Sequence, residues 1–165
     1  MKLVLLCSFF IAVIVAIGVK DYSSSHQITG MYSSLVNTTL PKQYHINKSY
    51  EYFLAIRMNL RNLGLPGVPA EEVTRIEQTV LEDLAKIAEE KKSYEALGFT
   101  AGQKDLYDKQ AKAWDDFVAV GGRVLALHKG SAEDKQKMID IFFGDCPKTA
   151  GAFKEATKKL LEFHD

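Results

Sequence analysis

This sequence has no excess charge of either sign and is poor in cysteine, proline and tryptophan. Its 165 residues carry 21 basic and 21 acidic side chains, four prolines, two cysteines and one tryptophan. Nucleic-acid binding requires a concentrated basic surface, which a chain of this charge balance lacks. Two cysteines, one of them within the first ten residues, cannot form a disulfide-stapled scaffold. Nucleic-acid partners and disulfide-rich folds are therefore excluded.

The motifs of catalysis and metal binding are also missing. The four histidines stand far apart in the chain and form no paired-ligand spacing. There is no nucleophile elbow, no phosphate-binding glycine loop and no Cys-x-x-Cys pair. Cys146 is expected either to be buried as a small apolar side chain or to pair between chains. We expect no enzyme, no catalytic or metal site, and no cofactor.

One long apolar run is present, at the N-terminus. Residues 3–19 are almost all apolar, and Ala16 and Gly18 are small residues at positions −3 and −1 of a signal-peptidase site. We expect residues 1–18 to be a cleaved signal peptide and the protein to be secreted. Removal of this segment deletes Lys2 and no acid, which leaves a net charge of −1. The alternative is a signal anchor in a membrane, because a helical run of this length spans roughly 25 Å.

The next segment, residues 19–47, is rich in Ser, Thr and Tyr. It shows neither a helical nor an alternating period, so we interpret it as a loosely ordered arm. Sequons at Asn37 and Asn47 are glycosylation candidates in a secreted chain. The predicted organisation is a signal peptide over 1–18, the arm over 19–47 and a helical domain over 48–165.

Helical signals dominate from residue 48 onward. Apolar residues from Val73 to Ile87 step by three and four, which is the period of an amphipathic helix. Helix-stop glycines and the helix-start pairs Thr100 with Gln103 and Ser131 with Asp134 divide the chain. They predict helices over 48–63, 69–92, 101–129 and 132–143, a short helical turn over 93–97, and a last helix from Pro147. The predicted fold class is all-α, a single compact domain of five to six amphipathic helices.

The apolar faces of these helices are wide. Such faces either close into a packed core or leave an apolar cavity between the helices. Gly121 and Gly122, inside the helix over 101–129, predict a close helix crossing or a kink. The candidate pocket-lining residues are Tyr107, Trp114, Phe117, Val118, Val124, Phe142 and Phe153. Arginine suits a ligand carboxylate because its planar fork matches it, and the candidate anchors are Arg57, Arg61 and Arg123.

Two stretches of the chain form a known pattern. Leu40-Pro41-Lys42-Gln43-Tyr44 precedes an aromatic-containing helix, and Asp105-Leu106-Tyr107-Asp108-Lys109 is followed by Asp116-Phe117-Val118. In this order they resemble the nematode fatty-acid- and retinol-binding proteins over most of residues 40–163. Gly121-Gly122 and the long N-terminal arm depart from that family.

The resemblance implies a secreted, all-helical carrier. It would hold fatty acids or retinol in an internal hydrophobic pocket and touch membranes transiently to transfer them. The alternative, from a different class, is a secreted helical interaction protein or antigen with a solid core and no small-molecule ligand. The sequence leaves the oligomeric state open.

Overall fold

The fold class predicted from the sequence, all-α, is confirmed. The computed structural model describes residues 2–65 and 67–164, and for residues 2–14 and 16 it describes the backbone alone. Every regular element within those ranges is a helix. The chain divides into two units, Met1–Pro41 and Lys42–Asp165.

The first unit is helical where a loosely ordered arm was expected. It contains α1 (Lys2–Ser34) and a π-helical turn, η1 (Leu35–Thr39), and α2 (Leu40–Leu63) begins at Leu40 rather than at Lys48. Polar side chains bond within their own helix, as when the Thr29 hydroxyl donates to the Ser25 carbonyl at 2.9 Å. A bond of this kind satisfies the hydroxyl inside a helix but does not stabilise the helix itself. The structure thus has helix where the sequence predicted a loosely ordered arm over 19–47.

The π-helical turn lies directly before Pro41. In an α-helix the N–H of residue 41 would bond to the carbonyl of Asn37, but proline has no N–H and its ring crowds that carbonyl. The wider turn accommodates this defect, and the Leu40 N–H bonds to the Leu35 carbonyl five residues back. Backbone angles at Ser34 and Leu40 stay helical on either side.

The N-terminal apolar run belongs to α1, whose backbone passes through Ala16 and Gly18 without a break. Among the residues whose side chains are described, no helix combines the length and the apolar character that crossing a membrane requires. The predicted signal peptide over 1–18 and the alternative anchor fall almost wholly outside those residues. Cleavage after Gly18 stays a prediction.

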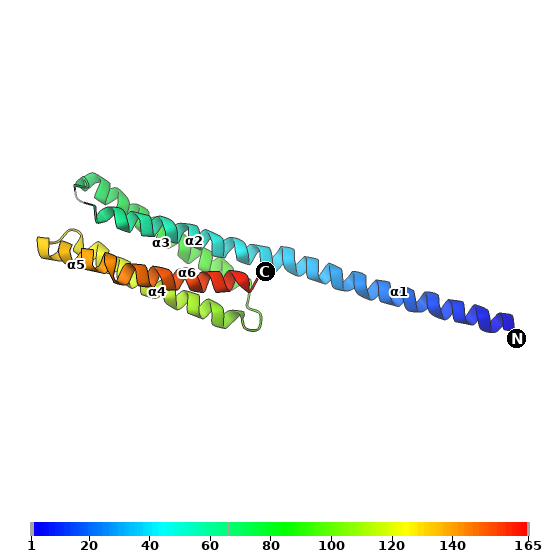
Figure 1. Ribbon diagram of the computed structural model, residues 1–165. Helices are drawn as coiled ribbons and strands as arrows, with labels where there is room; N and C mark the ends of the chain where they lie inside the picture. Colours follow the sequence, from blue (N-terminus) through cyan, green and yellow to red (C-terminus); the bar gives the residue numbers. More distant parts are fainter. Residues whose placement is uncertain (1, 66, 165) are drawn as a thin grey trace. The chain divides into compact units, whose positions relative to one another are not determined.

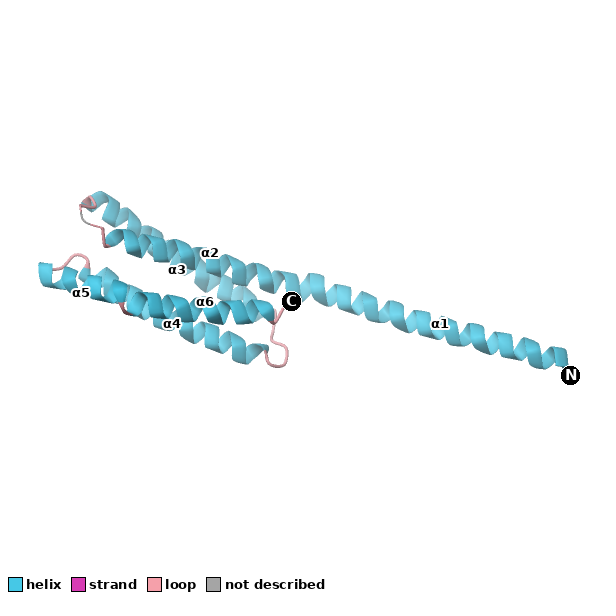
Figure 2. Cartoon of the chain, viewed as in Figure 1, coloured by secondary structure: helices cyan, strands magenta, loops and turns pink. Residues whose placement is uncertain are grey.

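The second unit is a bundle of four helical rods. Three of them are α2, α3 (Ala70–Ala96) and α4 (Gln103–Leu127), and the fourth is made of α5 (Ala132–Phe143) followed by α6 (Asp145–Glu162). Figure 1 and Figure 2 show α5 and α6 in succession alongside α4. The connections between rods are short, which is typical of helices that run antiparallel to their neighbours.

The fourth rod breaks where the chain has Gly144 followed by Pro147. Gly144 has φ −104° and ψ −78°, outside the usual helical angles. Pro147 has no N–H for the Phe143 carbonyl, so the α-helical ladder is interrupted there. The predicted helix over 132–143 is therefore correct, and α6 starts two residues earlier than predicted.

Other helix ends follow the sequence signals to different degrees. The Ser131 side chain accepts from the Asp134 N–H while the Asp134 carboxylate accepts from the Ser131 N–H, so this pair caps α5 as predicted. α3 runs on to Ala96, where the sequence predicted a stop near Lys92, because no helix breaker occurs before Gly98. Gly98 then adopts a positive φ of 70°, which favours glycine.

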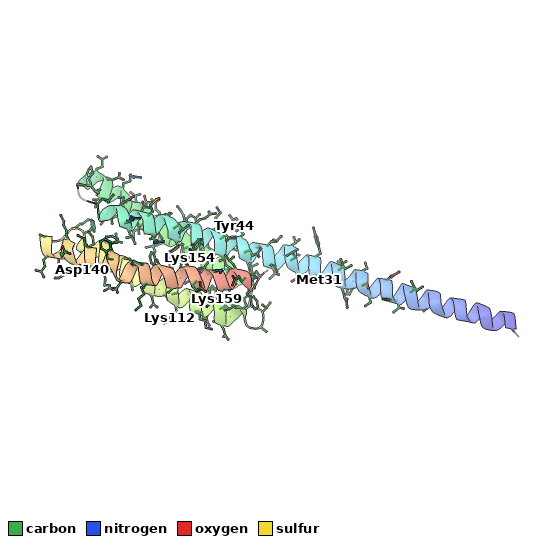
Figure 3. All side chains as sticks on the ribbon, in the orientation of Figure 1. Met31, Tyr44, Lys112, Asp140, Lys154 and Lys159 are labelled. Carbon is green, nitrogen blue, oxygen red and sulfur yellow. The ribbon has the colours of Figure 1, made fainter. Side chains whose placement is uncertain are left out.

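Apolar side chains from all four rods share one core. Buried residues in it include Phe53 and Ile56 from α2, Ile76 from α3, Phe117 from α4 and Phe153 from α6. Charged residues such as Lys112 on α4 and Asp140 on α5 are exposed on the outside of the bundle (Figure 3). Charged side chains of both signs thus lie on the solvated outer surface of the bundle.

Gly121 on α4 packs against Leu60 of α2, while the close crossing or kink expected at the glycine pair stays a prediction. A Cβ atom on Gly121 would lie 3.1 Å from Cδ1 of Leu60, whereas a Cβ on Gly122 would meet nothing within 4 Å. Leu60 is buried at 3% exposure, so it has little room to move. Only the first glycine is required by packing.

Two alanine variants test this difference. Gly122→Ala is expected to raise the free energy of unfolding by about 0.5–1 kcal/mol, because alanine is the better helix former and open space receives its methyl group. Gly121→Ala should gain clearly less or lose stability, because Leu60 must shift. Urea unfolding followed by circular dichroism at 222 nm measures both. Equal gains at the two positions would contradict the tight packing of Gly121 against Leu60.

Candidate functional site

An open groove lies where the end of α2 meets the break between α5 and α6. Its volume is about 680 Å³, within the range of small-ligand sites. The walls are mainly apolar and come from Leu54 and Met58 on α2 and from Ile139, Phe142 and Phe143 on α5. Phe143 is 85% exposed, so a large apolar surface is open to solvent here. The groove has the size and the lining of a binding site for a small molecule.

Two arginines line the same groove. Arg57 and Arg61 stand one turn apart on α2, and both are exposed. Among the described residues neither has an acidic partner, whereas Arg75 pairs with Glu72 and Arg123 pairs with Asp145, each at 2.5 Å. The groove therefore combines apolar walls with two guanidinium groups that are free to bind an anion.

The break between α5 and α6 shapes the groove floor. Phe142 packs so closely on Gly64 that a Cβ on the glycine would come within 2.8 Å of the ring. Cys146 and Pro147, in the first turn of α6, also line the groove. A continuous helix would not place these residues beside the turn that follows α2.

Cys146 is a free, half-buried thiol in this groove. Burial raises the pKa of the Cys146 thiol, and the carboxylate of Asp145 raises it further, while Arg123 and Arg57 lower it. The protonated thiol is a weak nucleophile. This site therefore offers no activated cysteine.

The predicted pocket residues are divided between the groove and the core. Phe117 and Phe142 reach the groove. Trp114, Val124 and Phe153 are buried in the core, and the Trp114 ring lies 5.3 Å from the Phe153 ring. Val118 packs at the edge of that core, while Tyr107 belongs to a second, smaller cluster with Tyr94 and Leu160. An enclosed apolar cavity is not confirmed, because these side chains pack on one another.

The remaining candidates lie elsewhere. Arg57 and Arg61 face the groove as described, but Arg123 is bound to Asp145 outside it. Asn37 in η1 and Asn47 in α2 are both exposed, and their glycosylation stays a prediction. Among the described residues, no group of histidine, cysteine and acidic side chains could hold a metal ion.

Sequence reasoning missed most of the apolar groove wall. Leu54 and Met58 lie on the side of α2 opposite the buried Phe53, Ile56 and Leu60. A second apolar stripe on a helix that already has a core face is the signal that identifies such residues.

The second unit is thus a four-helix bundle with an open, arginine-lined groove. The sequence model of one family, described as a four-helix-bundle sensory module for signal transduction, matches residues 1–164. The chain belongs to this family. No curated protein and no solved structure matches the chain significantly.

This membership corrects the resemblance to nematode fatty-acid- and retinol-binding proteins, which was wrong. The function that this resemblance implied was also wrong. That function was a secreted lipid carrier with fatty acid or retinoid as its partner. Charged amphipathic helices share heptad-like spacing whatever their function. The similarity of these segments therefore reflects their helical pattern and not common ancestry. The alternative, a helical interaction protein with a packed core, agrees better with these findings.

The electrostatics of the groove can be tested through Cys146 in a Cys7→Ser background. Asp145→Asn is expected to speed alkylation of Cys146 by iodoacetamide at pH 8, because it lowers the thiol pKa and increases the thiolate fraction. Arg123→Gln should slow it, because loss of the cation raises that pKa. Mass spectrometry over time gives the rates, with Lys112→Gln on the outside of α4 as the control. Changes of the same sign in both variants would refute the assignment.

Proposed function

We propose that the bundle is the sensory module of a signal-transduction receptor, and that it is not an enzyme. The observation that carries this proposal is the family match over residues 1–164, together with an open groove whose two arginines lack acidic partners. In this proposal the groove receives the stimulus, and the helices that line it pass the change on to a partner. α2, α5 and α6 all contribute to the groove, so a ligand there can shift one rod against another.

The chemistry of the groove favours a small organic anion with an apolar body. Arg57 and Arg61 present two forks to a carboxylate, and charge-assisted hydrogen bonds of this kind are about twice as strong as neutral ones. Met58, Ile139 and Phe143 would cover the apolar part. An open groove of this shape suits a ligand that must enter and leave quickly, as a sensor requires.

We propose that this module senses an extracellular stimulus and keeps its apolar run as a membrane anchor. Cleavage after Gly18 would cut through the middle of α1. The run over residues 3–19 is at the short end of what a bilayer requires. Release of the shortened chain into the medium would instead support secretion.

Binding of phenylacetate to the full chain in detergent micelles tests the groove. Isothermal titration calorimetry should detect phenylacetate and should detect phenylacetamide, its uncharged analogue, at least tenfold more weakly. Arg57→Ala and Arg61→Ala should each weaken phenylacetate about tenfold or more, because a hydrogen bond to a charged group is worth roughly 1.5–3 kcal/mol. Bound phenylacetate should also slow alkylation of Cys146.

Arg75→Ala is the matched control, since Arg75 lies outside the groove and is paired with Glu72. Its affinity for phenylacetate should equal that of the unmodified chain. Equal binding of acid and amide, or insensitivity to both groove arginines, would rule out carboxylate recognition here.

A further inference from the structure

A buried polar network joins all four rods at the bundle end opposite the groove. Lys42 comes from α2, Tyr94 from α3 and Gln103 from α4, while His164 lies just beyond the end of α6. Lys42 is 1% exposed, Tyr94 2% and Gln103 1%. Figure 1 shows that the ends of these helices lie together, beside the C-terminus. The site is remote from Arg57 and Arg61 and is independent of the proposed ligand.

Lys42 determines how the Gln103 amide is oriented. The Lys42 ammonium donates to Gln103 Oε1 at 2.7 Å, and the Thr100 N–H donates to the same oxygen at 3.0 Å. The rings of Tyr94 and Phe99 lie 5.6 and 5.9 Å from Lys42 Nζ and face its charge. A buried ammonium has donors only, so it requires an acceptor and would repel the amide NH₂ group. Rotation of the amide is therefore excluded while Lys42 is charged.

The fixed amide in turn determines the protonation state of His164. With its oxygen on Lys42, Gln103 directs Nε2 toward Tyr94 Oη at 3.0 Å and toward His164 Nε2 at 3.0 Å. An amide NH₂ can only donate, so His164 Nε2 must accept and therefore carries no proton. The ring that fits this network is neutral.

Protonation of His164 would set one N–H donor against another. It would also place a second positive charge one amide group away from buried Lys42. Tyr94 Oη, 3.2 Å from His164 Nε2, already accepts from Gln103, so it relieves only part of the conflict. Protonated His164 is therefore better solvated in water than inside the network.

We propose that this end of the bundle is a proton-binding site at which protonation of His164 releases the end of α6 from Gln103 and Tyr94. Histidine takes up a proton near pH 6.5, so the response falls in mildly acidic conditions. The module would then respond to pH at one end, in addition to binding a ligand in the groove at the other.

Other titratable groups also lie at this end of the bundle. The described ones are Lys42 and His45 on α2, Glu90, Lys91, Tyr94 and Glu95 on α3, and Tyr107 on α4. Tyr107 donates to the Glu95 carboxylate at 2.5 Å, and His45 Nδ1 lies 2.5 Å from Glu90.

The pH dependence has a definite sign. The folded state holds His164 neutral while the unfolded chain binds the proton near pH 6.5, so the unfolded state binds more protons below that pH. The free energy of unfolding therefore falls as the pH drops from about 7.5 to 5.5. The stabilisation that neutral His164 contributes is fully present above pH 7.5.

Thermal unfolding of the full chain in micelles at pH 7.5 and 5.5 tests the site. His164→Gln offers an acceptor that does not titrate, so its melting temperature should fall a few degrees less on acidification than that of the unmodified chain. Lys42→Met should shrink the fall as well, because the Gln103 amide can then turn its oxygen to a protonated His164. His26→Gln changes an exposed histidine of the first unit and should leave the fall unchanged.

A second measurement needs no variant. Long-range proton–nitrogen spectra of the full chain at pH 7.5 should show Nε2 of His164 as the unprotonated ring nitrogen. A doubly protonated ring at that pH would overturn the proposal, as would an undiminished pH effect in His164→Gln or in Lys42→Met. Increased cleavage near the end of α6 by an added protease at pH 5.5, absent in His164→Gln, would support it.

Discussion

The contact of Phe53 with two other aromatic rings holds the bundle together. Phe53 on α2 is 1% exposed, and its ring lies 4.9 Å from Phe117 on α4 and 4.7 Å from Phe153 on α6. Burial of one such side chain contributes about 1.5–3 kcal/mol, and each aromatic pair about 0.5–1.5 kcal/mol more. The groove and the polar network lie toward opposite ends of the helices that these rings join. The position of both sites therefore depends on this packing.

The helical fold could be predicted from local signals. Ser131 with Asp134 and Gly144 act within a few residues, so the sequence alone located both ends of α5 well. The helix before residue 48 was missed because the segment has no apolar period and is rich in Ser and Thr, which disfavour helix interiors. The π-helical turn before Pro41 likewise depends on how the helix relieves a missing donor.

The candidate site could be predicted only in part. Arg57 and Arg61 could be selected from the sequence, because they are the two of its four arginines that stand one helical turn apart. The groove itself depends on Phe142 seated on Gly64, and this contact joins residues 78 positions apart. No local pattern encodes such a contact. The same holds for Lys42 and Gln103, which are 61 residues apart and look like ordinary surface side chains in the sequence.

The lipid-carrier interpretation failed for a reason that is general to amphipathic bundles. Wide apolar faces were read as the wall of a cavity, but Trp114, Phe117 and Phe153 fill the space between the helices with one another. The open groove lies instead beside the broken fourth rod, where the helix is interrupted at Gly144 and Pro147.

Lys42 also differs from the surface charges in its response to salt. Ion pairs on the surface, such as Lys112 with Asp116, are exposed on both sides and are screened once the ionic strength reaches physiological values. The partner of Lys42 is a neutral amide that is sealed from solvent, so dissolved ions have no counter-charge to replace and no path to the ammonium. Changes in salinity will therefore loosen the coat of the bundle and leave the arrangement at its buried end intact.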